Sequence, residues 1–149
     1  MDKRKNKWSQ WKDLEKEPCS YEKSAIYKIR LSNHKGKPIA IPRFLKKDKN
    51  GILMIGRTKN LKRRLNNFRR AVEKNISPHS EGKKFHLIKS TRNFKTQYGS
   101  NWRLEYSFKR LCKNQIKKEE EKTLKNYFKE YGELPVLNSI LPKRKIQKK

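Results

Sequence analysis

We predict an α+β fold in which three strands form one sheet, helices pack on its faces, and the elements follow the order β-β-α-α-β-α. Three observations predict it. Two short apolar segments, at 25–31 and 52–55, lie on either side of a strong turn signal. An apolar stripe at helical spacing follows at 61–72. An aromatic-rich segment at 102–108, typical of a third strand, then precedes a last helical pattern at 114–131.

The first two strands are predicted to pair as a hairpin. Residues 25–31 alternate between two faces, one of which carries Tyr27, as a strand does. A long polar connection ends at Asn50 and Gly51, which form a strong turn signal directly before the apolar run 52–55. The pair is therefore expected to be antiparallel, with an unusually long loop.

Three helices are predicted from caps and apolar spacing. Asn60 is a good N-cap for the first, and Gly99 ends a weaker second helix at about 77–97. The third runs over 114–131 and stops at Gly132. The apolar stripe of the first helix consists of Leu61, Leu65, Phe68 and Val72.

The length of 149 residues fits one domain. We place it at 21–141, after a basic lead at 1–20 and before a basic tail at 142–149 that is predicted to be disordered. In the lead, Trp8 and Trp11 lie three residues apart. This spacing predicts a short amphipathic helix that packs both rings onto the domain, with stacking on bases as the alternative.

The charge points to a polyanion as partner. The chain has 42 Lys and Arg against 14 Asp and Glu, so its formal net charge is +28. Such an excess repels itself and is expected where nucleic acid is bound. No apolar run approaches the ~20 residues of a membrane-spanning helix, and no secretory signal is apparent, so no membrane is expected. Cys19 and Cys112 are isolated, which predicts reduced thiols in a cytoplasmic protein, nucleoid-associated if bacterial, without structural zinc.

Three residues have patterns that allow chemistry. Glu120 falls about 40° from Ile116 on the apolar side of the last helix, where a carboxylate must be paired with an arginine, protonated or bound to a metal. Arg64 borders the stripe of the first helix and could clamp a phosphate, or be one more surface cation. Tyr27 is either a core side chain or a general base, and the second role requires nearby cations to lower its phenol pKa.

Taken in order, these segments resemble the motifs of the GIY-YIG nuclease family. Residues 25–27 read Ala-Ile-Tyr, similar to the Gly-Ile-Tyr of the family's first strand. Residues 54–56 read Met-Ile-Gly, similar to the Tyr-Ile-Gly of its second strand. Arg64 lies eight residues past that glycine, as the family's arginine does. Glu120 stands on a later helix upstream of Asn138, as the family's metal-binding glutamate stands upstream of an asparagine.

The resemblance covers about residues 24–139 and implies a three-stranded antiparallel sheet flanked by helices. It implies a metal-dependent endonuclease that hydrolyses DNA phosphodiester bonds. Tyr27 would be the general base, Arg64 would stabilise the transition-state phosphate, and Glu120 would bind one Mg²⁺ or Mn²⁺. The expected supporting residues are Asn138, Arg57 and His79. The cations expected to contact nucleic acid are Lys59, Lys62, Arg63, Arg69, Arg70 and Lys83.

Two positions depart from the family pattern. Met54 replaces the second tyrosine, and Phe68 replaces a histidine or tyrosine one turn after the arginine. Losing one positioned donor typically costs 10²–10³ in rate, so we expect a slow enzyme or a substitute group such as His79 or a lysine. The alternative is a noncatalytic nucleic-acid-binding protein that retains the fold. A basic RNA-associated protein is a third interpretation, and DNA is preferred to RNA because the family mostly cuts DNA.

Overall fold

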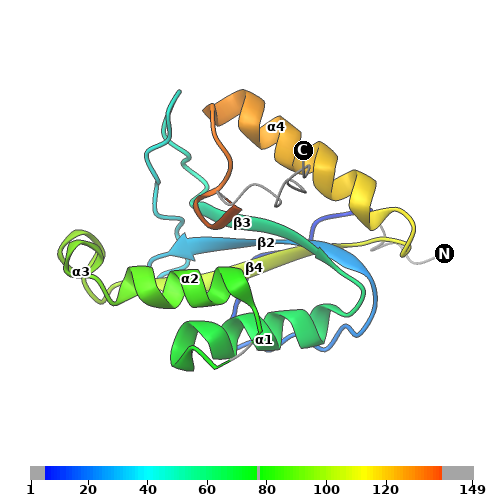
Figure 1. Cartoon of the computed structure of the whole chain (residues 1–149), viewed down its shortest axis with the longest axis horizontal. Helices are drawn as coiled ribbons and strands as arrows, with labels where there is room; N and C mark the ends of the chain where they lie inside the picture. The colour runs from blue at the N-terminus through cyan, green and yellow to red at the C-terminus, as the bar shows by residue number, and fades with distance from the viewer. Residues whose placement is uncertain (1–5, 77, 139–149) are drawn as a thin grey trace, which may run out of the picture.

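The structure is a computed structural model that describes residues 6–76 and 78–138. Within these ranges one antiparallel sheet has the strand order β1-β4-β2-β3 (Figure 1). Its strands are β1 (Lys12–Asp13), β2 (Ala25–Ser32), β3 (Ile52–Thr58) and β4 (Arg103–Arg110). The helices are α1 (Leu61–Lys74), α2 (Ser80–Lys89), α3 (Arg92–Tyr98) and α4 (Ile116–Tyr131), followed by the 3-10 helix η1 (Val136–Asn138). The α+β class and the hairpin of β2 with β3 are confirmed.

The prediction of three strands was wrong by one, because the basic lead adds β1 to the edge of β4. Ser9 N–H donates to the carbonyl of Phe108 at 2.8 Å, and Trp8 forms an isolated antiparallel bridge with Lys109. The predicted helix around Trp8 and Trp11 was therefore also wrong. An edge strand has unpaired backbone N–H and C=O groups that a neighbouring segment can satisfy. Here the backbone pairing with β4 outweighs the helical conformation that the spacing of the two tryptophans indicated.

Both indole rings nevertheless pack onto the domain, as the lead was expected to do. Trp8 packs against Ile26 and Ile116, and Trp11 packs against the apolar cluster that contains Ile52. Trp8 also lies under Lys28, whose Nζ is 4.2 Å from the ring centroid. The lead thus runs along β4 from Asn6 to Leu14.

The single weak helix predicted at 77–97 is two helices. α2 ends at Lys89, and Thr91 begins α3 by accepting a hydrogen bond from Phe94 N–H at its hydroxyl. Ser and Thr side chains compete with helical backbone bonding, which favours a break at such a pair. The aromatic rings of Phe85 and Phe94 then meet at 5.7 Å in the core. The element order over the described ranges is β-β-β-α-α-α-β-α, followed by η1.

The main core lies between the sheet and the pair of helices α1 and α2. Alternate residues of β2, including Tyr27, Ile29 and Leu31, face this core together with Leu65 and Phe68 of α1. On the other side of the sheet, α4 lies along β3 (Figure 1) and packs through a separate buried cluster. β3 is an edge strand of the sheet, and both α4 and η1 contact it.

The long loop at 33–51 folds back onto α4. Asp48 is fully buried in it and accepts a hydrogen bond from the Tyr127 hydroxyl at 2.7 Å. The same side chain accepts backbone hydrogen bonds from Asn50 and Ile52, which fixes the turn into β3. Gly51 adopts a φ of +67° there, which explains the glycine of the turn signal.

Across the described ranges, no helix combines the length and apolar character that crossing a bilayer requires. The predicted disorder of 142–149 and the domain end at 141 lie outside the described residues.

Candidate active site

The site begins where the ring of Tyr27 crosses over Gly56. The two residues pair across β2 and β3, and Tyr27 is fully buried. A Cβ at position 56 would lie 2.6 Å from both Cζ and Oη of Tyr27, far inside van der Waals contact. Only glycine leaves room for the ring, so the sequence Met54-Ile55-Gly56 lets the phenol cross the edge strand.

The hydroxyl oxygen of Tyr27 is approached by two side chains from two helices. Arg64 of α1 donates from Nε to this oxygen at 3.3 Å. His79, the N-cap residue of α2, has its Nε2 at 3.5 Å from the same oxygen. Tyr27, Arg64 and His79 are far apart in sequence, and the sheet and the α1–α2 pair bring them together.

The tautomer of His79 follows from its role as a cap. Its Nδ1 accepts a hydrogen bond from the backbone N–H of Gly82 at 3.2 Å, so Nδ1 carries no proton. Burial and, to a smaller extent, the neighbouring cation Arg64 lower the pKa of His79 to about 4 against the opposing charge of Glu81, so the ring is neutral at pH 7. A neutral ring with an accepting Nδ1 has its proton on Nε2, which then donates toward Tyr27.

The two positions that depart from the family pattern are both apolar and buried. Met54 is 1% exposed and belongs to the main core, and Phe68 is fully buried. The ring of Phe68 packs edge-on against His79, with centroids 5.0 Å apart and planes at 76°. The imidazole therefore lies beside the position where the resemblance expects a polar ring. His79 is the substitute group that this geometry provides.

Tyr27 does not have the lowered pKa that the role of general base requires. Its pKa is raised to about 12, chiefly by burial and also by the carboxylates of Glu81 and Glu120. Arg64 opposes these effects through its charge and its hydrogen bond but does not cancel them. Tyr27 therefore carries its proton at pH 7. Because its oxygen already faces two donors, that proton points away from Arg64 and His79.

Glu120 reaches the site from α4. Its side chain is 21% exposed and faces Arg57 Nε at 3.9 Å. Burial raises the pKa of Glu120, and the positive charges of Arg57 and Arg64 oppose the rise. Its two neighbours behave differently, because Glu119 pairs with Lys109 at 3.1 Å and Glu121 is exposed. Of the three consecutive glutamates, the middle one is directed at the Tyr27 and Arg64 side of the molecule.

Glu81 is a member of the site that sequence reasoning missed. It lies in the first turn of α2, with Oε2 3.7 Å from Arg64 Nη2 and 3.3 Å from His79 Nδ1. It also adds to the pKa rise of both Tyr27 and Glu120. An acidic residue in a helical first turn is common because it complements the helix dipole. Because Glu81 has this ordinary explanation, nothing in the sequence indicates that it is a second carboxylate at the site.

Asn138 contacts the backbone of β3 next to Gly56. Its Oδ1 accepts from Ile55 N–H at 2.8 Å, and its Nδ2 donates to the Ile55 carbonyl at 2.9 Å. The side chain thus occupies the free edge of β3, as a neighbouring strand would. Its supporting role remains a prediction, and this contact gives it a physical basis.

The predicted nucleic-acid contacts do not gather at the Tyr27 hydroxyl. On α1, Lys62 and Arg69 lie about 140–160° around the helix axis from Arg64, and with Arg63 they line a separate hollow against the lead. Lys62 pairs there with Glu22, and Arg69 with Glu73. The exposed members of the set are Lys59, Lys62, Arg63, Arg70 and Lys83, so a nucleic acid that contacted all of them would have to extend well beyond the site.

The donor set suits a hard divalent cation with few protein ligands. Mg²⁺ is commonly held by one or two carboxylates together with water and substrate phosphates. Glu120, with Glu81 of α2 as a second carboxylate whose charge it senses, matches that description. In the part of the chain that the structure describes, no group of three or more His, Cys, Asp or Glu side chains gathers.

Comparison of the chain with family models, curated proteins and solved structures gives no match. The fold and the geometry of the site carry the functional argument.

Proposed function

We propose that the protein is a metal-dependent endonuclease that hydrolyses phosphodiester bonds of DNA. The observation that carries the proposal is the grouping of Tyr27, Arg64 and Glu120 from β2, α1 and α4 at one edge of the sheet. A phenol, a guanidinium and a carboxylate are the groups that phosphodiester hydrolysis requires for proton transfer, phosphate binding and metal binding. The net charge of +28 supplies the attraction to the polyanion.

The reaction assigns one task to each group. Tyr27 must first release its own proton to solvent and become a phenolate. A water oxygen then attacks phosphorus, the bond from phosphorus to the leaving oxygen breaks, and the water proton passes to the Tyr27 phenolate. The Nη groups of Arg64 bind the non-bridging oxygens as their charge grows. The Nε2–H of His79 stabilises the Tyr27 oxygen when it lacks its proton. A divalent cation held at Glu120 would supply positive charge that lowers the Tyr27 pKa and neutralises the leaving oxygen.

A noncatalytic nucleic-acid-binding protein is the second candidate. It is favoured by the raised pKa of Tyr27, which keeps the phenol protonated at pH 7, and by the apolar side chains of Met54 and Phe68. It gives no reason for Arg64 and His79 to direct donors at one phenol oxygen. The nuclease accounts for that arrangement, so we place it first.

Cleavage of supercoiled plasmid with Mg²⁺ or Mn²⁺ tests the proposal. The variants are Glu120→Gln and, as a matched control, Glu121→Gln, which changes the adjacent exposed carboxylate. We expect metal-dependent nicking or linearisation by the wild type and by Glu121→Gln. Glu120→Gln should be at least ~10²-fold slower while it still binds DNA. Tight, salt-sensitive binding without cutting in any metal would instead establish the binding protein.

A further inference from the structure

The tip of the long loop between β2 and β3 displays large apolar side chains to solvent. Phe44 is 79% exposed and Leu45 is 60% exposed. Both lie against Gly132, the C-cap of α4, where a Cβ would meet Leu45 Cγ at 2.7 Å and Phe44 Cδ1 at 3.1 Å. Phe128 stands one turn earlier on α4 and is 53% exposed. We call Phe44, Leu45 and Phe128 the tip patch.

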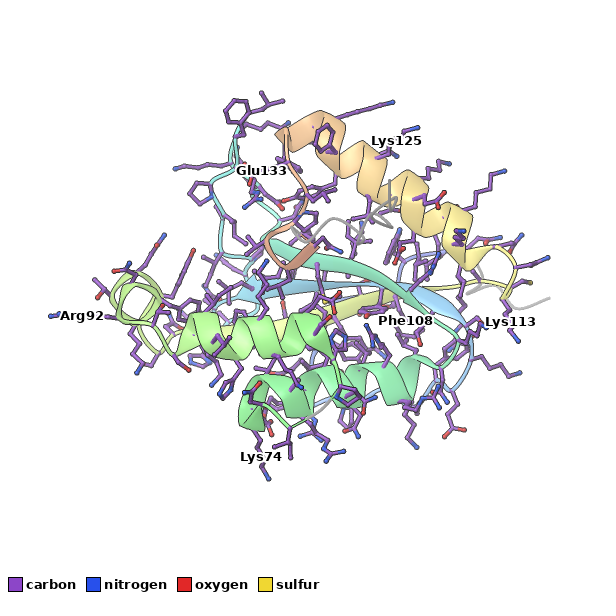
Figure 2. The ribbon with its side chains drawn as sticks, in the orientation of Figure 1. Lys74, Arg92, Phe108, Lys113, Lys125 and Glu133 are labelled. Carbon is purple, nitrogen blue, oxygen red and sulfur yellow. The ribbon has the colours of Figure 1, made fainter. Side chains whose placement is uncertain are left out.

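The tip patch is held in place by polar contacts to the end of α4. Phe44 N–H donates to Glu133 Oε2 at 2.9 Å, and Leu45 N–H donates to the Tyr131 carbonyl at 3.0 Å. Arg43 forms an ion pair with Glu133. The labelled Glu133 lies between the loop and the helix end in Figure 2. A surface that is already ordered loses little conformational entropy when it binds, so exposed rings held this firmly are suited to insertion into a partner.

The charge around the tip patch selects the kind of partner. Within five residues of Phe44 or Phe128, the exposed lysines of the loop and of α4 are Lys46, Lys47, Lys49, Lys125 and Lys129. Of the nearby carboxylates, Glu130 pairs with Lys46 at 2.9 Å and Glu133 pairs with Arg43, so the other four lysines leave an excess of positive charge. A second copy of this chain would bring the same lysines and a net charge of +28, so like charges oppose self-association there. A polyanion is the complementary partner.

We propose that the tip patch is a wedge that inserts between base pairs of duplex DNA and bends it. This inference rests on the proposed function for its partner. Apolar side chains such as Phe and Leu unstack base steps from the minor groove and kink DNA by roughly 20–90°. The lysines of the loop and of α4 contact the phosphates on either side of the unstacked step.

The position of the wedge fits a duplex held at the candidate active site. Glu120 and Gly132 are 132 − 120 = 12 residues apart along α4 and its cap. Twelve residues of helix extend about 18 Å, which corresponds to about five base-pair steps of ~3.4 Å. Glu120 therefore lies in the second turn of α4, and the wedge is supported at its C-cap. An anionic membrane also accepts Phe and Leu beside lysines, and it is one of the outcomes that the test distinguishes.

The test measures bending of a short duplex labelled at both ends with a donor and an acceptor dye, in EDTA so that cutting plays no part. The variant is Phe44→Ala with Leu45→Ala. The matched control is Leu87→Ala on α2, because Leu87 is 63% exposed and lies outside the tip patch. We expect the wild type and Leu87→Ala to raise energy transfer. The double variant should bind about tenfold more weakly, as for the loss of one stacking contact, and leave the duplex straight.

Three results would overturn the wedge. The wild type fails to bend the duplex, or the double variant bends it as the wild type does. In the third, the double variant still bends DNA but has lost another property of the wild type. Lost binding to phosphatidylserine vesicles would assign the patch to a membrane, and lost self-association would assign it to a second copy of the chain. Cutting is assayed separately with Mg²⁺. Bending without cutting therefore overturns only the nuclease, and cutting without bending overturns only the wedge.

Discussion

The hydroxyl oxygen of Tyr27 and the Nε2 of His79 lie 3.5 Å apart, although 52 residues separate them in sequence. His79 is fixed from its other side, because Gly82 N–H occupies Nδ1. We infer that the N-cap of α2 provides the polar group that Met54 and Phe68 lack. Catalytic contacts of this length commonly tighten when a substrate binds.

Replacing His79 by asparagine separates its two roles. The variant His79→Asn keeps a side chain that caps α2 by accepting from Gly82 N–H, but the shorter side chain does not reach Tyr27. We expect the variant to fold and to cut DNA about 10²–10³-fold more slowly, in single-turnover assays. His79→Ala also loses the cap, so its free energy of unfolding should fall by about a further 1 kcal/mol. A His79→Asn protein that cuts at the wild-type rate contradicts the assignment.

The pH dependence of stability should report the buried imidazole. In the fold, burial lowers the His79 pKa to about 4, whereas an exposed histidine titrates near 6.5. The folded pKa is depressed, so the unfolded chain takes up the proton first as pH falls. Stability that is fully present above pH 6.5 is therefore lost between pH 6.5 and 4, by about 3 kcal/mol.

Urea unfolding of the wild type and of His79→Asn between pH 7 and pH 4 checks this expectation. Other groups titrate in both proteins, so the difference between the two curves isolates His79. The wild type should have the higher free energy of unfolding at pH 7, and its difference from His79→Asn should shrink as the pH falls. Parallel curves would mean that His79 is not held neutral by the fold.

The sequence predicted the elements that rest on local signals. The two strands of the hairpin, the Asn60 cap and the α4 helix are all present, and Asn60 Oδ1 accepts from Arg63 N–H as a cap does. Helical angles also placed Glu120 on the inward side of α4, where it meets Arg57. These features depend on residues a few positions apart, which a sequence displays directly.

The features that the sequence did not predict depend on distant partners. Trp8 and Trp11 have helical spacing, but the free edge of β4 draws their backbone into extended pairing. Ser90 and Thr91 split a predicted helix, because Phe94 must turn into the core to meet Phe85. Glu81 enters the site only because α1 and α2 bring it to Arg64, and no spacing in the sequence reports that contact.

Gly56 should tolerate no larger residue. The variant Gly56→Ala places a Cβ 2.6 Å from the Tyr27 ring, and Arg64 and His79 limit the movement of that ring. Urea unfolding should show a loss of about 1–3 kcal/mol, and cleavage should fall because the hydroxyl is displaced. Gly99→Ala is the control, since a Cβ there meets nothing within 4 Å and only its φ of +59° is strained. It should keep its cleavage rate. A fully active Gly56→Ala would show that the phenol need not cross β3 at this point.

The variant Tyr27→Phe tests whether the Tyr27 hydroxyl takes part in cutting. The substitution removes one oxygen and leaves the buried ring in place, so the fold and the affinity for DNA should be retained. We predict that plasmid cleavage with Mg²⁺ or Mn²⁺ falls by at least ~10²-fold relative to the wild type. Cleavage by Tyr27→Phe at the wild-type rate would contradict the claim and place the chemistry elsewhere in the molecule.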